Sequence, residues 1–290
     1  MTKNGRGPTV LLMAGNHGDE YEGQVVLTRM IRELEPSEIR GRVIIVPTAN
    51  VAASLAGVRT SPIDEGNLNR AFPGEANATP TFAMAHYYDS VLFPMADAFI
   101  DVHSGGTSMD YLPFASISTS GDAAVDARAT SLLAAFGAPI SIVWDAVDLR
   151  MAEVAAARRG VAAVSGEFGG GGTVVRGGVQ IVHRGIANAL RHLGILPANE
   201  IKPANSRLME IPSNDFYVFA AEAGLFEPQA ELGDMVRSGD PCGLIHFVDN
   251  PAREPVQAFF HTDGLLVCRR HPARVERGDC LGHLARDVAT

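Results

Sequence analysis

The sequence is poor in cysteine and in long hydrophobic segments. Only three of its 290 residues are cysteines, and so sparse and odd a set does not form a disulfide framework. No apolar run approaches the roughly 20 residues that span a bilayer, and the N-terminus lacks the apolar core of a signal peptide. We therefore expect a cytoplasmic protein without a membrane partner.

Positive charge is also scarce. The chain has 24 basic and 33 acidic residues, for a net charge of −9. Proteins that bind nucleic acid or anionic membranes depend on clustered positive charge, so the composition argues against nucleic acid as a partner. The sequence leaves open whether the chain forms a homo-oligomer.

The first two-thirds of the chain alternate short apolar runs with helical patterns. This alternation predicts an α/β fold in which a mixed central sheet is flanked by helices. The expected strands are residues 9–14, 42–49, 98–103, 111–118, 139–144 and 161–168. The expected helices are residues 22–35, 79–93, 122–136, 149–159 and 178–193, and residues 50–78 are expected to form a long loop. Trp144, the only tryptophan, is expected in the core at a strand end.

The pattern changes after Leu196. Residues 197–212 contain three prolines and resemble a linker, and residues 213–290 show short strands separated by Gly-Asp and Asp-Gly turns. We expect a catalytic α/β domain at 1–196, a linker at 197–212 and a small β-sandwich or barrel at 213–290. The C-terminal turns resemble those of lipoyl and biotinyl carriers, but no lysine follows Lys202 to carry a cofactor.

The N-terminus carries an isolated turn signal. Asn4-Gly5 is typical of a two-residue hairpin, yet only three residues precede it. We therefore expect that the strand pairing with residues 9–14 is missing and that the chain lacks an N-terminal segment.

Polar residues follow several of the expected strands at their carboxyl ends, where open α/β sheets bind ligands. His17 and Glu20 come after the first strand, and His103 ends the strand at 98–103. Residues three apart can share one helical face, and two histidines, one carboxylate and an open fourth position are typical of catalytic zinc. Asp101, two residues before His103, is placed to orient an imidazole.

Glu167 lies near the end of the expected strand at 161–168, and a run of four glycines follows Phe168. A metal-activated water needs a base that takes its proton and an acid that protonates the leaving nitrogen, and Glu167 is the candidate for both roles. The glycine run lacks the Gly-Lys-Ser/Thr ending of a phosphate-binding loop. The alternative is a surface glutamate beside a flexible loop.

Three further polar residues lie in the expected loop at 50–78. Asn69 and Arg70 offer hydrogen-bond donors suited to a substrate carboxylate. Arg59 could stabilise an oxyanion on the attacked carbonyl. The alternative for both arginines is a solvated position in the loop.

Four separated segments together resemble the succinylglutamate desuccinylase/aspartoacylase family, relatives of the zinc carboxypeptidases. They are Gly15-Asn-His-Gly-Asp-Glu20, Asn67-Leu-Asn-Arg70, Asp101-Val-His-Ser-Gly105 and Gly166-Glu167. The resemblance spans residues 9–196. The sequences of residues 15–23 and 61–74 are most similar to a branch of the family that deacetylates N-acetyl-L-2,4-diaminobutyrate.

The resemblance implies a zinc carboxypeptidase-like fold with one Zn²⁺ per chain. It assigns zinc to His17, Glu20 and His103, the substrate carboxylate to Asn69 and Arg70, the acyl carbonyl to Arg59 and proton transfer to Glu167. It implies hydrolysis of the amide bond of an N-acyl amino acid, which releases a carboxylic acid and the free amino acid. A metallocarboxypeptidase acting on short peptides and a non-catalytic metabolite-binding protein are the alternatives.

Overall fold

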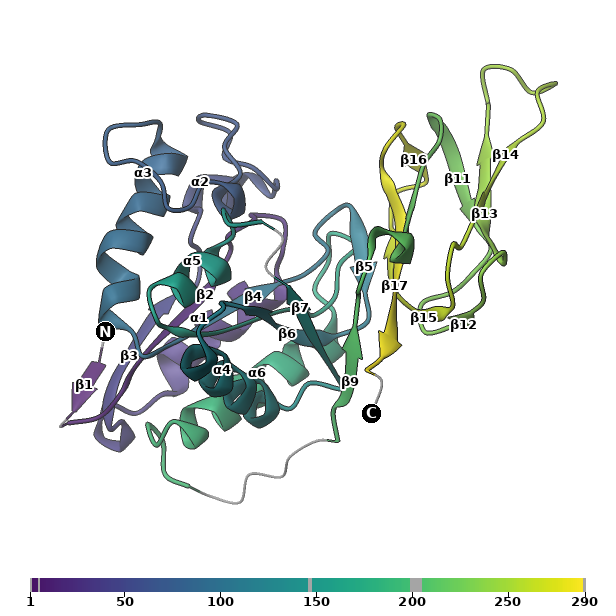
Figure 1. The fold of residues 1–290 in the computed structure, drawn as a ribbon. Helices are drawn as coiled ribbons and strands as arrows, with labels where there is room; N and C mark the ends of the chain where they lie inside the picture. Colours follow the sequence, from purple (N-terminus) through teal and green to yellow (C-terminus); the bar gives the residue numbers. More distant parts are fainter. Residues whose placement is uncertain (1, 5, 146–147, 199–204, 289–290) are drawn as a thin grey trace.

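The computed structural model describes residues 2–4, 6–145, 148–198 and 205–288, and its dominant feature is a mixed sheet of 13 strands (Figure 1). Eleven strands follow one another across it: β1 (Thr2–Asn4), β3 (Gly41–Val46), β2 (Thr9–Ala14), β4 (Ala98–His103), β8 (Ala162–Glu167), β6 (Phe114–Thr119), β7 (Ile140–Asp145), β9 (Arg207–Glu210), β17 (Cys280–Asp287), β15 (Gly264–Arg270) and β12 (Met235–Val236). Two more pair at the side, β10 (Tyr217–Phe219) with β17 and β5 (Met109–Tyr111) with β15.

A separate antiparallel sheet lies in the C-terminal region. It contains β14 (Val256–Phe259), β13 (Pro241–His246), β11 (Gly224–Pro228) and β16 (Arg274–Val275), in that order. The predicted fold class, a mixed α/β sheet with helices and C-terminal β structure, is confirmed.

Helices cover both faces of the N-terminal part of the large sheet (Figure 1). One face packs against α1 (Glu22–Glu33), α4 (Ala123–Phe136) and α6 (Arg176–His192), and the other against α3 (Pro80–Tyr87) and α5 (Ala152–Arg158). Because both faces are covered, β2 and β4 are buried almost throughout.

Local sequence accounts for several of these boundaries. Asp122 caps α4 by accepting hydrogen bonds from the backbone of Ala124 and Val125, and Gly137 ends the helix in the left-handed conformation. After α3 the chain continues as a π turn at Tyr88–Leu92 and a 3₁₀ turn at Phe93–Met95, so the predicted helix at 79–93 has a change of pitch.

The segment expected to be a long loop at 50–78 contains helical structure. α2 (Val51–Ala56) begins after Asn50, whose side chain accepts a hydrogen bond from the backbone of Ala53. The helix ends at Gly57, which has the left-handed conformation. A 3₁₀ turn follows at Leu68–Arg70. The cap at Asn50 and the glycine at 57 were the available signals, but six residues are too few for a clear helical period.

Two further expectations differ from the structure. Arg207–Glu210, within the predicted linker, forms β9, which pairs in parallel with β7 and antiparallel with β17. The N-terminal part of the large sheet therefore continues into C-terminal strands, and the proposed division into domains stays a prediction. The expectation that the strand pairing with residues 9–14 is missing is wrong, because β2 pairs in parallel with both β3 and β4.

His283, on β17, is a buried histidine whose titration should make the stability of the protein depend on pH. It is 3% exposed, its ring lies between Tyr111 and Tyr217 at centroid distances of 5.6 and 4.9 Å, and its Nδ1 has no hydrogen-bond partner among the described residues. Burial lowers the pKa of His283 to about 4.

We expect the protein to lose about 3 kcal/mol of unfolding free energy between pH 7 and pH 4 on account of this one residue. The lowered pKa means that the unfolded state binds the proton first. The stabilisation is therefore complete above pH 6.5 and is lost as the pH falls towards the folded-state pKa. Denaturant unfolding of wild type and His283→Gln across this range measures it, and equal pH slopes for the two proteins would contradict it.

Candidate active site

The candidate site lies at the carboxyl ends of three neighbouring parallel strands. β2 leads into the turn that carries His17 and Glu20, β4 ends at His103 and β8 ends at Glu167. His103 and Glu167 are register partners across β4 and β8. The parallel pairing brings together residues that are far apart in sequence, as the pattern of strand ends predicted.

The turn after β2 is held close to α2. A Cβ on Gly18 would lie 2.0 Å from the backbone carbonyl carbon of Ala53, and the Gly18 amide donates to the carbonyl of Val58 at 3.0 Å. Only glycine permits this approach. The helix that the sequence did not predict therefore supports the turn that carries His17 and Glu20.

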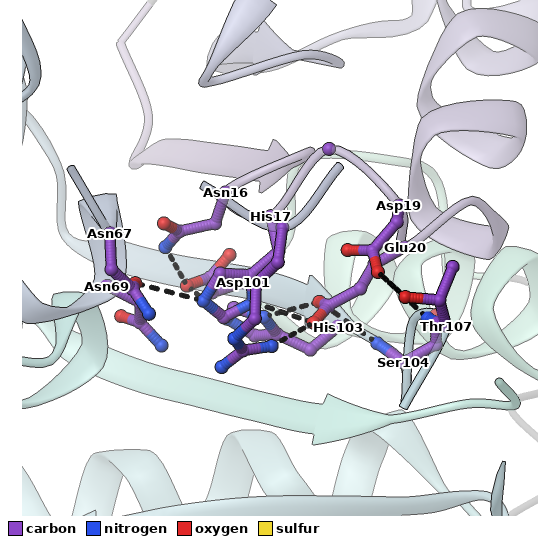
Figure 2. Close-up of polar contacts among 12 residues, drawn as sticks. Asn16, His17, Asp19, Glu20, Asn67, Asn69, Asp101, His103, Ser104 and Thr107 are labelled. Atoms are coloured by element: carbon purple, nitrogen blue, oxygen red, sulfur yellow. Dashed lines mark hydrogen bonds and ion pairs between the residues drawn. The ribbon is translucent and has the colours of Figure 1, made fainter. Parts of the chain in front are cut away.

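His17, Glu20 and His103 converge in the interior (Figure 2). Their exposures are 3, 3 and 5%, and one ligand atom from each lies within 4.8 Å of the others. The Nδ1 atoms of His17 and His103 lie 2.6 and 2.8 Å from the two carboxylate oxygens of Glu20. In the described part of the chain this is the one cluster of His, Cys, Asp or Glu that could hold a metal ion.

The other imidazole nitrogens have partners of their own. His103 Nε2 lies 2.9 Å from Asp101 Oδ2, and His17 Nε2 lies 3.1 Å from Asn67 Oδ1 (Figure 2). Both oxygens are acceptors, so they favour a proton on Nε2 and make Nδ1 of each ring the nitrogen whose lone pair a cation would take in place of the contact with Glu20. Two lone pairs and a carboxylate converging in a buried space form a donor set suited to a cation such as zinc.

The electrostatics of the three residues follow from this arrangement. Burial alone would raise the pKa of Glu20, but His17 and His103 hold it below its ordinary value. Burial alone would lower the pKa of His103, but Asp101 and Glu20 raise it well above 6.5. For His17, burial outweighs Glu20 and lowers the pKa.

Asn67 was not identified from the sequence, although Asp101 was. Asn67 precedes Asn69 in the segment that the sequence singled out for binding a carboxylate. The signal available was its place in that segment, but a side chain's contact with an imidazole 50 residues away is not a local property of the sequence.

Glu167 is half-buried at the end of β8 and lines a cavity of about 110 Å³ next to the cluster. Its Oε2 is buried and has no hydrogen-bond partner among the described residues. Burial, followed by the negative charge of Glu20, raises the pKa of Glu167 to about 8. A carboxyl group with a raised pKa is suited to accepting and returning a proton near neutral pH.

The same cavity is lined by residues that the sequence placed in the site: His17, Arg59, Asn69, Arg70 and His103. Arg59 Nη1 lies 3.2 Å from Glu20 Oε1. Arg70 Nε lies 3.2 Å from Asp148 Oδ2, and Arg70 Nη1 donates to the backbone carbonyl of Asn69 at 2.7 Å. Both arginine side chains are about two-fifths exposed, at 43 and 38%, which leaves them accessible to a ligand.

Asn69 has a structural contact that the sequence did not indicate. It is 4% exposed, and its Oδ1 accepts a hydrogen bond from the backbone of Ala152, the first residue of α5, at 2.8 Å. The loop that carries Arg70 is thereby joined to α5.

Several cavity-lining residues were not identified from the sequence. Trp144, expected in the core, is half-buried and lines the cavity with Phe114 and Met151. Glu153, on α5, is a second carboxylate of the wall and is only 4% exposed. Burial raises the pKa of Glu153 to about 7. An isolated Glu in an alanine-rich helix carries no sequence signal of such a position.

The model of the succinylglutamate desuccinylase/aspartoacylase catalytic domain matches residues 6–193 of the chain. The chain belongs to this family. The matched region contains the cluster of His17, Glu20 and His103, the Asn-Arg segment and Glu167. The resemblance in the four sequence segments is therefore confirmed at the level of the family.

Relatives support the same assignment over the whole chain. The chain is 39% identical over 290 residues to the N-alpha-acetyl-L-2,4-diaminobutyric acid deacetylase of Halomonas elongata, covering 99% of this chain and 85% of the relative. It superimposes on the product-bound ectoine utilization protein EutE (DoeB) from Ruegeria pomeroyi with a TM-score of 0.95 at 38% identity, covering 98 and 87% of the two chains. For a succinylglutamate desuccinylase/aspartoacylase from Rhodobacter sphaeroides the TM-score is 0.93 at 39% identity, with 99 and 88% covered.

Within the described residues, no helix is both long and apolar enough to cross a membrane. The cytoplasmic location stays a prediction from the sequence, and a homo-oligomer stays a possibility that the sequence left open.

Proposed function

We propose that this chain is a zinc-dependent deacylase that hydrolyses the amide bond of an N-acyl amino acid, with N-acetyl-L-2,4-diaminobutyrate as substrate. The observation that carries the proposal is the buried His17, Glu20 and His103 cluster opening on a cavity that Glu167 also lines. The family and the 39% identical deacetylase support the reaction class and the substrate.

A zinc ion held by His17, Glu20 and His103 would supply Lewis acidity, which polarises the acyl carbonyl and lowers the pKa of a water molecule. The chain's own residues do the rest. Arg70 and Asn69 bind the carboxylate of the amino acid and fix the acyl group against the cluster. Asp101 and Asn67 hold the histidines with Nδ1 free for the metal.

Glu167 moves the proton. Its unpartnered Oε2 takes a proton from the attacking water and then delivers it to the nitrogen of the departing amine. Arg59, beside Glu20, stabilises negative charge on the acyl oxygen as the carbonyl is attacked.

Metal analysis of the purified protein followed by a hydrolysis screen tests the proposal. The screen compares N-acetyl, N-succinyl and N-formyl derivatives of several amino acids with short peptides. We expect one zinc per chain and turnover of the N-acetyl compounds. Cleavage of peptides in preference to them would indicate a metallocarboxypeptidase, and bound zinc with no hydrolysis at all would indicate a non-catalytic binding protein.

A further inference from the structure

The cavity contains a carboxylate that the proposed reaction does not use. Glu153 lies in the first turn of α5 and lines the cavity, yet it is 4% exposed, and its Oε2 is buried without a hydrogen-bond partner among the described residues. A buried carboxylate oxygen without a donor is unfavourable, because it has lost water without gaining a compensating hydrogen bond. A charged ligand group would supply that donor.

The neighbouring cationic side chains have other partners. Arg70 makes its ion pair with Asp148, and Arg59 makes its own with Glu20. Asp148 also accepts two hydrogen bonds from the side chain of Arg150 and one from its backbone. In the cavity wall described here, Glu153 is thus the carboxylate left to receive a positive charge from a ligand, whereas Glu167 serves proton transfer.

The position of Glu153 relates it to the rest of the substrate. Asn69 binds the backbone of Ala152, the residue before Glu153, so the carboxylate-binding segment and Glu153 are held together. The apolar side chains of Trp144, Phe114 and Met151 line the same cavity. A short aliphatic side chain ending in an ammonium group matches apolar walls with one buried carboxylate, since an ammonium ion offers three hydrogen-bond donors.

We propose that Glu153 binds the side-chain ammonium group of the substrate and thereby selects N-acyl diamino acids over N-acyl amino acids with neutral side chains. This inference rests on the proposed deacylase function, and it assigns to Glu153 the choice of the amino acid rather than the chemistry. The negative charge is recognised only by a cationic substrate, so a neutral substrate of the same shape gains nothing from it.

The test compares two substrates of nearly equal shape, Nα-acetyl-L-2,4-diaminobutyrate and N-acetyl-L-norvaline, in which a methyl group replaces the ammonium group. Wild type should show about 100-fold higher kcat/KM for the diaminobutyrate compound. Glu153→Gln should lose about 100-fold on that compound and change less than about threefold on the norvaline compound, with zinc content unchanged.

Glu22→Gln is the matched control. Glu22 is also buried, and its Oε2 likewise has no partner among the residues that the structure describes, but its Oε1 accepts a hydrogen bond from the backbone of Val175 and it does not line the cavity. This variant should change both substrates by the same factor. An equal effect of Glu153→Gln on both substrates, or no preference in wild type, would overturn the proposal and leave the deacylase function standing.

Two measurements keep the inference testable if a variant or the assay fails. Glu153→Asp retains the charge and should keep part of the preference even if the glutamine variant does not fold. If wild type hydrolyses no N-acyl amino acid, the proposed function fails, but calorimetric binding of L-2,4-diaminobutyrate against L-norvaline still measures ammonium recognition. Equal affinities there would overturn the role of Glu153.

Discussion

Glu167→Gln should reduce kcat by about 10³-fold while the protein keeps one zinc per chain. Glutamine preserves the shape of the side chain but cannot accept and return a proton. The carboxylate is suited to proton transfer because it lines the cavity, its buried Oε2 has no hydrogen-bond partner in the described part of the chain, and burial raises its pKa to about 8. Steady-state kinetics on the best N-acyl amino acid and metal analysis of the same sample measure the two effects together.

Glu227→Gln is a control for the same substitution in the C-terminal sheet, where Glu227 pairs with His246 away from the cavity. It should leave kcat unchanged within about twofold, as surface substitutions usually do. Near-normal turnover in Glu167→Gln would contradict the assignment of proton transfer to Glu167. Loss of zinc from that variant would instead give this residue a part in metal binding.

Removal of the metal should abolish hydrolysis, and one equivalent of zinc per chain should restore it. His17, Glu20 and His103 present two imidazole nitrogens and a carboxylate to one point, and the remaining cavity residues cannot by themselves polarise an acyl carbonyl to the same degree. Dialysis against a chelator, followed by assay before and after addition of zinc, measures this. We expect residual activity below about 1% of the initial rate.

His103→Ala should lose metal affinity as well as activity, because one of three ligand atoms is removed. His183→Ala is its matched control, since His183 is exposed on α6 and pairs with Glu33. Titration with zinc under competition from a chromogenic chelator separates the two variants. Full activity in a sample with less than a few per cent of its metal would overturn a metal-dependent mechanism.

Much of the site could be predicted because its residues occupy strand ends. His17, Glu20, His103 and Glu167 each follow an apolar run whose length and composition indicate a buried strand. Parallel strands place their carboxyl ends at one edge, so a local pattern repeated along the chain implies proximity in space. Asp101 was found for the same reason, since alternation along β4 relates it to His103.

The contacts between segments could not be obtained in this way. Asn67 faces His17 across 50 residues, and Glu153 faces the cavity from a short alanine-rich helix. Trp144 was expected in the core because it is a tryptophan at the end of an expected strand. How far it is buried depends on what packs against β7, which the sequence of β7 does not contain. β9 was assigned to the linker because a segment of four residues between prolines is too short to show the alternation that indicates a strand.

By itself the sequence determined the α/β class, the family resemblance and the set of polar residues at the strand ends, because these depend on local periodicity and on motif spacing. Only the tertiary structure decided which nitrogen of each histidine faces Glu20, that α2 supports the turn at Gly18 and that the large sheet runs on through β9 into C-terminal strands. It also decided that Glu153 lines the cavity with one buried oxygen that has no partner among the described residues. These features depend on side chains from distant segments sharing one buried space, where packing and hydrogen bonding are settled jointly rather than residue by residue.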